Sequence, residues 1–137
     1  MRARLAGALW AAAVVLVVAA AAVDLVNRAG GHGNPWLPSI AAAALGFGTV
    51  GGLIAARHPA NPIGWLLLVI GVGHAVSGVA IGYGTWAATR PGLVTGAAVG
   101  LWLGEWAWSP LIVMPAVFLL FPTGRLSTRR LRPVLAV

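Results

Sequence analysis

The sequence contains no cysteine and no lysine, and its only acidic residues are Asp24 and Glu105. Without cysteine there is no disulfide framework, no thiolate metal site and no cysteine nucleophile. Charged residues make up only 8% of the chain, whereas a soluble domain carries roughly 25%. Because 60% of the residues are hydrophobic, lipid is the expected solvent for most side chains.

The sequence also lacks the patterns that carry catalysis. It has no glycine loop followed by lysine for phosphate binding, no nucleophile elbow and no histidine pair at metal-ligand spacing. We therefore predict no catalytic residue, no cofactor and no metal site.

Long apolar runs separated by short polar gaps indicate about four membrane-spanning helices. A helix needs about 20 mostly apolar residues to cross the hydrocarbon core. We predict an all-α, polytopic membrane protein with one transmembrane domain over residues 1–137. The spans are expected at about residues 5–26, 36–56, 63–87 and 94–121, with Asn61 capping the third and Pro110 and Pro115 bending the last.

The two ends of the chain need separate interpretation. Residues 5–23 follow two arginines and end in small alanines, which is also typical of a secretory signal peptide, but their length favours an uncleaved helix. Residues 122–132 form a basic segment, in which Pro122 and Gly124 end the fourth helix. Residues 133–137 are apolar again, so we expect the start of a fifth span and a fragment or truncated chain.

The arginines predict the orientation, because cytoplasmic loops carry an excess of basic residues. With the N-terminus inside, seven arginines are cytoplasmic, and only Arg28 and Arg90 are outside. We therefore predict a multi-pass protein of the plasma membrane with a cytoplasmic N-terminus. The arginines sit in short gaps and not on one face, which argues against nucleic-acid binding. The basic cluster expected to bind anionic inner-leaflet lipids is Arg125, Arg129, Arg130 and Arg132.

Glycines at a spacing of four residues mark three predicted spans. Small residues allow helix backbones to approach closely in lipid. Chance also produces such spacings among 19 glycines, so the pattern favours packing without naming the partner, and a homodimer through these faces is one expectation. The glycines are Gly48 and Gly52, Gly78 and Gly82, and Gly96, Gly100 and Gly104.

Two ionisable residues are predicted near the bilayer midplane. His74 and Glu105 each lie eleven residues into their spans, or about 16 Å from opposite ends of antiparallel helices. A charge at that depth is costly and marks a functional candidate. His74 and Glu105 are therefore a candidate intramembrane polar pair that senses protonation or fixes helix register. The alternative is a protonated glutamate bonded to backbone or to a serine such as Ser77 or Ser109.

The remaining polar and aromatic candidates are open to two interpretations. Trp102, Trp106 and Trp108 surround Glu105 in sequence and either line a small apolar ligand pocket or pack against neighbouring helices. Asp24, at the end of the first span, is expected in the headgroup layer and not in a site.

Two segments carry a recognisable pattern. The first reads Arg57-His-Pro-Ala-Asn-Pro-Ile-Gly-Trp-Leu-Leu-Leu68, and the second reads Trp106-Ala-Trp-Ser-Pro110 and then Leu120-Phe-Pro-Thr-Gly-Arg-Leu-Ser-Thr-Arg-Arg-Leu-Arg-Pro133. In content, order and separation they resemble the N-terminal membrane region of actinobacterial two-component sensor histidine kinases, over residues 57–137. Thr123, Ser127 and Leu131 replace the aspartate, proline and tryptophan usual in that family.

The resemblance implies a membrane-embedded sensory region that feeds cytoplasmic kinase domains which these residues do not contain. The chain itself would then not be an enzyme. The alternatives are a small transporter or channel subunit that uses His74 and Glu105, or a structural membrane protein that assembles through its glycine faces.

Overall fold

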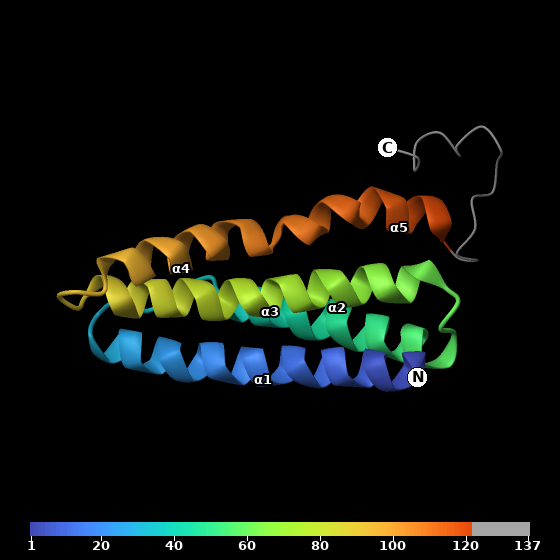
Figure 1. Cartoon of the computed structure of the whole chain (residues 1–137), viewed down its shortest axis with the longest axis horizontal. Coiled ribbons are helices and arrows are strands. Elements are labelled where there is room, and N and C mark those ends of the chain that lie inside the picture. The colour runs from blue at the N-terminus through green and yellow to red at the C-terminus, as the bar shows by residue number, and fades with distance from the viewer. Residues whose placement is uncertain (122–137) are drawn as a thin grey trace.

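The computed structural model describes residues 1–121, and that part of the chain consists of helices and short turns. The helices run alternately in opposite directions (Figure 1). Four of them, counting α4 to α5 as one, are long and apolar enough to cross a membrane, which confirms the predicted all-α fold of about four spans. They are α1 (Arg2–Ala29), α2 (Leu37–Arg57), α3 (Pro62–Ala88), and α4 (Val94–Ala107) followed by the 3₁₀ helix η1 (Ser109–Val113) and α5 (Met114–Leu120).

Helix ends follow the local sequence signals. At the start of α3, the Asn61 side chain accepts a hydrogen bond of 3.0 Å from the Ile63 amide, and Pro62 occupies the first helical position. The cap at Asn61 was predicted. The Trp65 indole donates to the Pro59 carbonyl at 3.1 Å and ties the helix to the α2–α3 turn. In the turns at the opposite end, Gly31 and Gly92 adopt positive φ angles of 79° and 85°, which side chains other than glycine rarely accept.

Helix α3 is the centre of the molecule. It packs against α1, α2 and α4 (Figure 1), and over half of its apolar stretch is buried, against about a fifth for each of the other spans. Lipid gives little reason to bury leucine, so a buried membrane helix needs small residues that let its neighbours approach. Many of the buried positions of α3 are glycine, alanine or serine.

The packing between α1, α2 and α3 repeats every seven residues. On α1 the buried positions include Ala6, Ala13, Ala20 and Asn27, and on α2 they include Leu37, Ala44 and Gly51. A seven-residue repeat keeps one narrow seam of a helix facing its partner when two helices cross at a shallow angle. Ala13, Ala44 and Ala75 meet in one layer, and Ala6, Ala55 and Leu68 meet in another.

Helix α1 is an integral part of this bundle. Three of its alanines, Ala6, Ala13 and Ala20, are buried in the bundle, and the Trp10 indole donates a hydrogen bond of 3.1 Å to the Thr49 hydroxyl on α2. The uncleaved first helix stays a prediction.

The fourth span is broken and not merely bent. Proline has no amide hydrogen and its ring clashes with the carbonyl four residues earlier, so Pro110 cannot continue α4. The chain passes through η1 and resumes as α5 with Pro115 in its first turn. The last described turn packs back on the beginning of α3, through Val117 and Leu120 against Ile63 and Leu67. The predicted basic segment 122–132, with its arginine cluster, and the expected fifth span at 133–137 lie outside the described residues.

Candidate functional site

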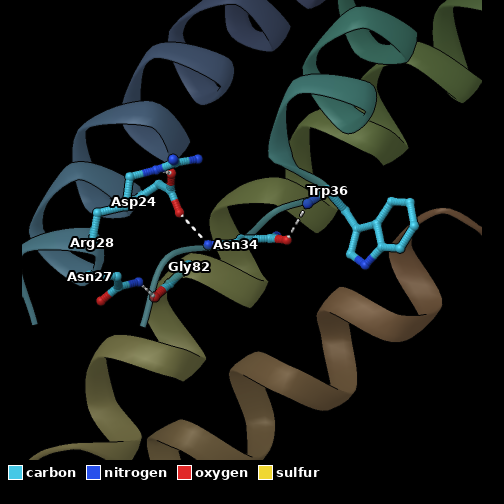
Figure 2. Close-up of polar contacts among 6 residues, drawn as sticks. All are labelled: Asp24, Asn27, Arg28, Asn34, Trp36 and Gly82. Carbon is cyan, nitrogen blue, oxygen red and sulfur yellow. Dashed lines mark hydrogen bonds and ion pairs between the residues drawn. The ribbon is translucent and has the colours of Figure 1, made fainter. Parts of the chain in front are cut away.

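A buried polar cluster lies where the α1–α2 turn closes. Figure 2 shows Asp24 on α1 between Arg28, one turn further along the helix, and Asn34 in the turn. One Asp24 carboxylate oxygen accepts from the Arg28 guanidinium, and the other accepts from the Asn34 backbone amide at 2.6 Å. The Asn34 side chain in turn accepts from the Trp36 amide at 2.9 Å.

The neighbouring residue Asn27 extends this cluster to the central helix. Its side-chain amide donates a hydrogen bond of 3.0 Å to the Gly82 carbonyl on α3 (Figure 2). Glycine at position 82 brings the α3 backbone close enough for this contact, because any added Cβ would press on Val23 of α1. Asn27 is the last position of the seven-residue repeat on α1, so the row of buried alanines ends at a polar residue that is hydrogen-bonded to α3.

The sequence does not predict this cluster. Asp24 was expected among lipid headgroups, but only 4% of it is exposed, whereas 53% of the Arg28 side chain is exposed. Within residues 1–121, no buried side-chain nitrogen or oxygen lacks a hydrogen-bond partner. Each Asp24 carboxylate oxygen accepts a hydrogen bond from the α1–α2 segment, so the cluster holds the α1–α2 turn in place.

The two midplane candidates are directed to different neighbours. The His74 Nδ1 atom lies 2.9 Å from the Ile70 carbonyl on its own helix, and the ring packs 6.3 Å from the Phe47 ring on α2. Glu105 lies on the exposed face of α4. In the part of the chain that the structure describes, no hydrogen bond or ion pair joins them.

The polar contact that joins α3 to α4 is made by Ser77. Its hydroxyl donates a buried hydrogen bond of 2.6 Å to the Gly104 carbonyl. Around it, Gly84 and Gly100 are packed so tightly that a Cβ on Gly100 would lie 3.0 Å from the Gly84 Cα. Two of the ladder glycines, Gly100 and Gly104, are thus buried against α3, which confirms their predicted role in packing.

The other predicted glycine pairs are also used within the chain. A Cβ at Gly48 would be in van der Waals contact with Gly71 of α3, and one at Gly52 would be in van der Waals contact with Trp10 of α1. Gly78 likewise packs near Ala20 of α1. These contacts lie within one chain, and the homodimer through glycine faces stays a prediction.

An open groove of about 540 Å³ lies along the break in the fourth span. Its wall contains a carboxylate, that of Glu105. Gly73 of α3 supports the break from behind, since a Cβ there would lie 2.5 Å from the Ala107 carbonyl and 2.9 Å from the Pro110 ring. The groove is lined by Glu105, Trp106, Trp108, Ser109, Leu111 and Ile112.

Arg90 makes its contacts at the end of α3. Arg90 caps the end of α3 by donating to the Trp86 carbonyl at 2.7 Å, and its guanidinium lies 3.9 Å from the centre of the Trp86 ring. Among the residues that the structure describes, no three histidine or acidic side chains gather in a way that could hold a metal ion.

Four apolar spans, one of them a central glycine-rich helix, indicate a multi-pass membrane protein. Comparison of the chain with protein-family models, with curated proteins and with solved structures finds no match.

Proposed function

We propose that this chain is the membrane-embedded signal-input region of a two-component sensor histidine kinase. The proposal places it in the plasma membrane with a cytoplasmic N-terminus, where its arginine cluster binds anionic lipids. Its basis is the resemblance of residues 57–137 to that family. One observation supports it most: the described parts of both motifs lie where a helix begins or is interrupted. The first motif caps α3 at Asn61, and the second contains the break at Pro110.

The break between α4 and α5 is consistent with a region that transmits a helix movement to the domains that follow. A 3₁₀ stretch in the middle of a helix often marks a functional hinge, and η1 separates α4 from α5 at such a point. Helix α4 is fixed to α3 by the Ser77 hydrogen bond and by close glycine contacts. Helix α5 touches α3 over a shorter stretch, around Ile63 and Leu67. A stimulus that rotates α5 about the hinge would displace the chain that follows it.

Two measurements test the proposal. The reading frame beyond Val137 should encode a phosphoacceptor helix and an ATP-binding domain. In the full-length protein in liposomes, Gly73→Ala should push Ala107 and Pro110 away from α3 and change autophosphorylation about threefold or more, within the range of coupling energies measured for such networks. The matched control is Gly46→Ala, because a Cβ there meets nothing within 4 Å.

A frame that continues without those domains would remove the basis of the proposal. Equal autophosphorylation in Gly73→Ala and wild type would leave the kinase assignment in place but contradict the hinge.

A transporter or channel subunit is the second candidate. The observation in its favour is the Glu105 carboxylate, which borders an open groove at mid-depth. A proton or ion path would also need His74, which instead packs against Phe47. Ion flux in liposomes decides the question: flux that is absent, or unchanged by Glu105→Gln, would exclude this function.

A further inference from the structure

The groove at the break in α4 has the size and the composition of a ligand site. Its volume of about 540 Å³ falls within the roughly 300–1,000 Å³ typical of small-molecule pockets. Its walls combine two indole rings and two aliphatic side chains with a single carboxylate and a single hydroxyl. Trp106 and Trp108 are both well exposed on it.

Helix packing does not explain why a carboxylate lies there. Glu105 follows Gly104, whose carbonyl is already bonded to Ser77, and Gly104 is the residue that faces α3. Glu105 points away from that interface, and in residues 1–121 its side chain takes part in no hydrogen bond or ion pair. An ionisable group at such a depth is costly and is usually retained for function.

We propose that this groove binds a lipophilic organic cation that enters it from the bilayer. The Glu105 carboxylate supplies the opposite charge in a medium of low dielectric constant, where ion pairing is strong. The exposed indole faces of Trp106 and Trp108 attract the same cation through their ring quadrupoles. Leu111 and Ile112 contact the apolar substituents, and the open side of the groove allows entry from the lipid.

The chemistry of the walls favours this class of ligand over a metal ion. A hard cation such as Mg²⁺ or Ca²⁺ requires six or more oxygen ligands, whereas the described walls offer the Glu105 carboxylate and the Ser109 hydroxyl. A cation that carries its own apolar shell needs one counter-charge and aromatic surface. The site stands on these contacts whether or not the chain belongs to a kinase.

The test measures binding of tetraphenylphosphonium to the protein in nanodiscs of zwitterionic lipid. Binding is measured by equilibrium dialysis, and empty nanodiscs give the uptake by lipid alone. We expect Glu105→Gln to weaken binding by about tenfold or more and Trp108→Leu by about threefold to tenfold, in line with the strength of cation–π contacts and of ion pairs in lipid. Trp36→Leu is the matched control, because Trp36 is 71% exposed but lies outside the groove. Circular dichroism and size-exclusion profiles establish that each variant is folded.

An uncharged compound of similar size, triphenylphosphine oxide, separates recognition of the positive charge from non-specific hydrophobic binding. It should bind wild type and Glu105→Gln alike, and more weakly than the cation binds wild type. The proposal is overturned if the cation binds wild type no better than empty nanodiscs, if Glu105→Gln keeps wild-type affinity, or if Trp36→Leu weakens binding as much as Trp108→Leu.

Discussion

The Ser77 hydroxyl on α3 lies 2.6 Å from the Gly104 carbonyl on α4, one residue before the only glutamate of the chain. This contact fixes how α4 is rotated about its axis. Because successive residues of a helix point about 100° apart, turning Gly104 toward α3 turns Glu105 away from it. The same bond that joins the two helices therefore exposes the carboxylate in the groove.

Removal of this bond should weaken the α3–α4 contact measurably but modestly. Ser77→Ala leaves the Gly104 carbonyl without its side-chain donor, and interhelical hydrogen bonds in membranes average about 0.6 kcal/mol with a maximum of about 1.7 kcal/mol. We expect a loss of unfolding free energy in that range, measured by titration from mild detergent into dodecyl sulfate. Ser39→Ala is the control, because Ser39 is exposed on α2. A loss no greater than that of Ser39→Ala would contradict the structural role of Ser77.

The close contact between α2 and α3 gives a sharper prediction. A Cβ on Gly51 would lie 2.8 Å from the Gly64 carbonyl oxygen, against backbone that cannot turn aside. Gly51→Ala should destabilise the protein by about 1–3 kcal/mol through overpacking. The higher helix propensity of alanine offsets at most about 1 kcal/mol of this loss.

The control for that variant lies on the same helix. Gly46→Ala gains the same propensity without any clash, since nothing lies within 4 Å of its added Cβ. Melting temperatures in detergent micelles should therefore fall for Gly51→Ala and stay level or rise for Gly46→Ala. Equal shifts would mean that α2 and α3 are not packed as described.

Helix ends and lengths are the part of the fold that the sequence predicts well. The third span is predicted at 63–87 and observed at Pro62–Ala88, because Asn61, Pro62 and the apolar run each have a local effect. The seam between α1, α2 and α3 was not predicted. The predicted glycine pairs recur at a spacing of four, whereas Ala6, Ala13 and Ala20 recur at seven, the spacing of helices that cross at a shallow angle.

For the functional candidates, too, the sequence predicts one property and not another. Sequence gives the depth of His74 and Glu105, because rise per residue is constant. It does not give the direction of each side chain, which depends on how each helix is rotated against its neighbours, and Phe47 and Ser77 decide that. The Asp24 cluster depends on the path of the turn that brings Asn34 back to α1, a path that no local pattern specifies.

Asp24 should matter more than its ion-pair partner. Asp24→Ala removes the acceptor of the Asn34 amide and of Arg28 together, and hydrogen bonds to charged groups contribute about 1.5–3 kcal/mol. Arg28→Gln removes a half-exposed partner, where an ion pair contributes about 1 kcal/mol or less.

Hydrogen exchange at the Asn34 amide reports on this directly. It should accelerate by about tenfold to a hundredfold in Asp24→Ala, as the lost bond energy implies, and by much less in Arg28→Gln. Exchange at Asn34 that accelerates equally in both variants would show that the arginine is as necessary to the turn as the carboxylate.

The proposed orientation can be tested because the chain has no cysteine of its own. Arg28 and Arg90 lie at the end of the bundle that holds the α1–α2 and α3–α4 turns. Arg2, Arg4 and Arg57 gather at the opposite end, where the N-terminus lies (Figure 1). An excess of basic residues is retained on the cytoplasmic side.

Single cysteines in the two exposed turns should therefore react differently with a membrane-impermeant maleimide on intact cells. His32→Cys, in the α1–α2 turn, should be labelled from outside, and His58→Cys, in the α2–α3 turn, should be labelled only after the membrane is permeabilised. Each variant is the control for the other, because both replace an exposed histidine in a turn. The reverse pattern would place the N-terminus outside and the hinge motion of α5 on the wrong side of the membrane for a cytoplasmic kinase.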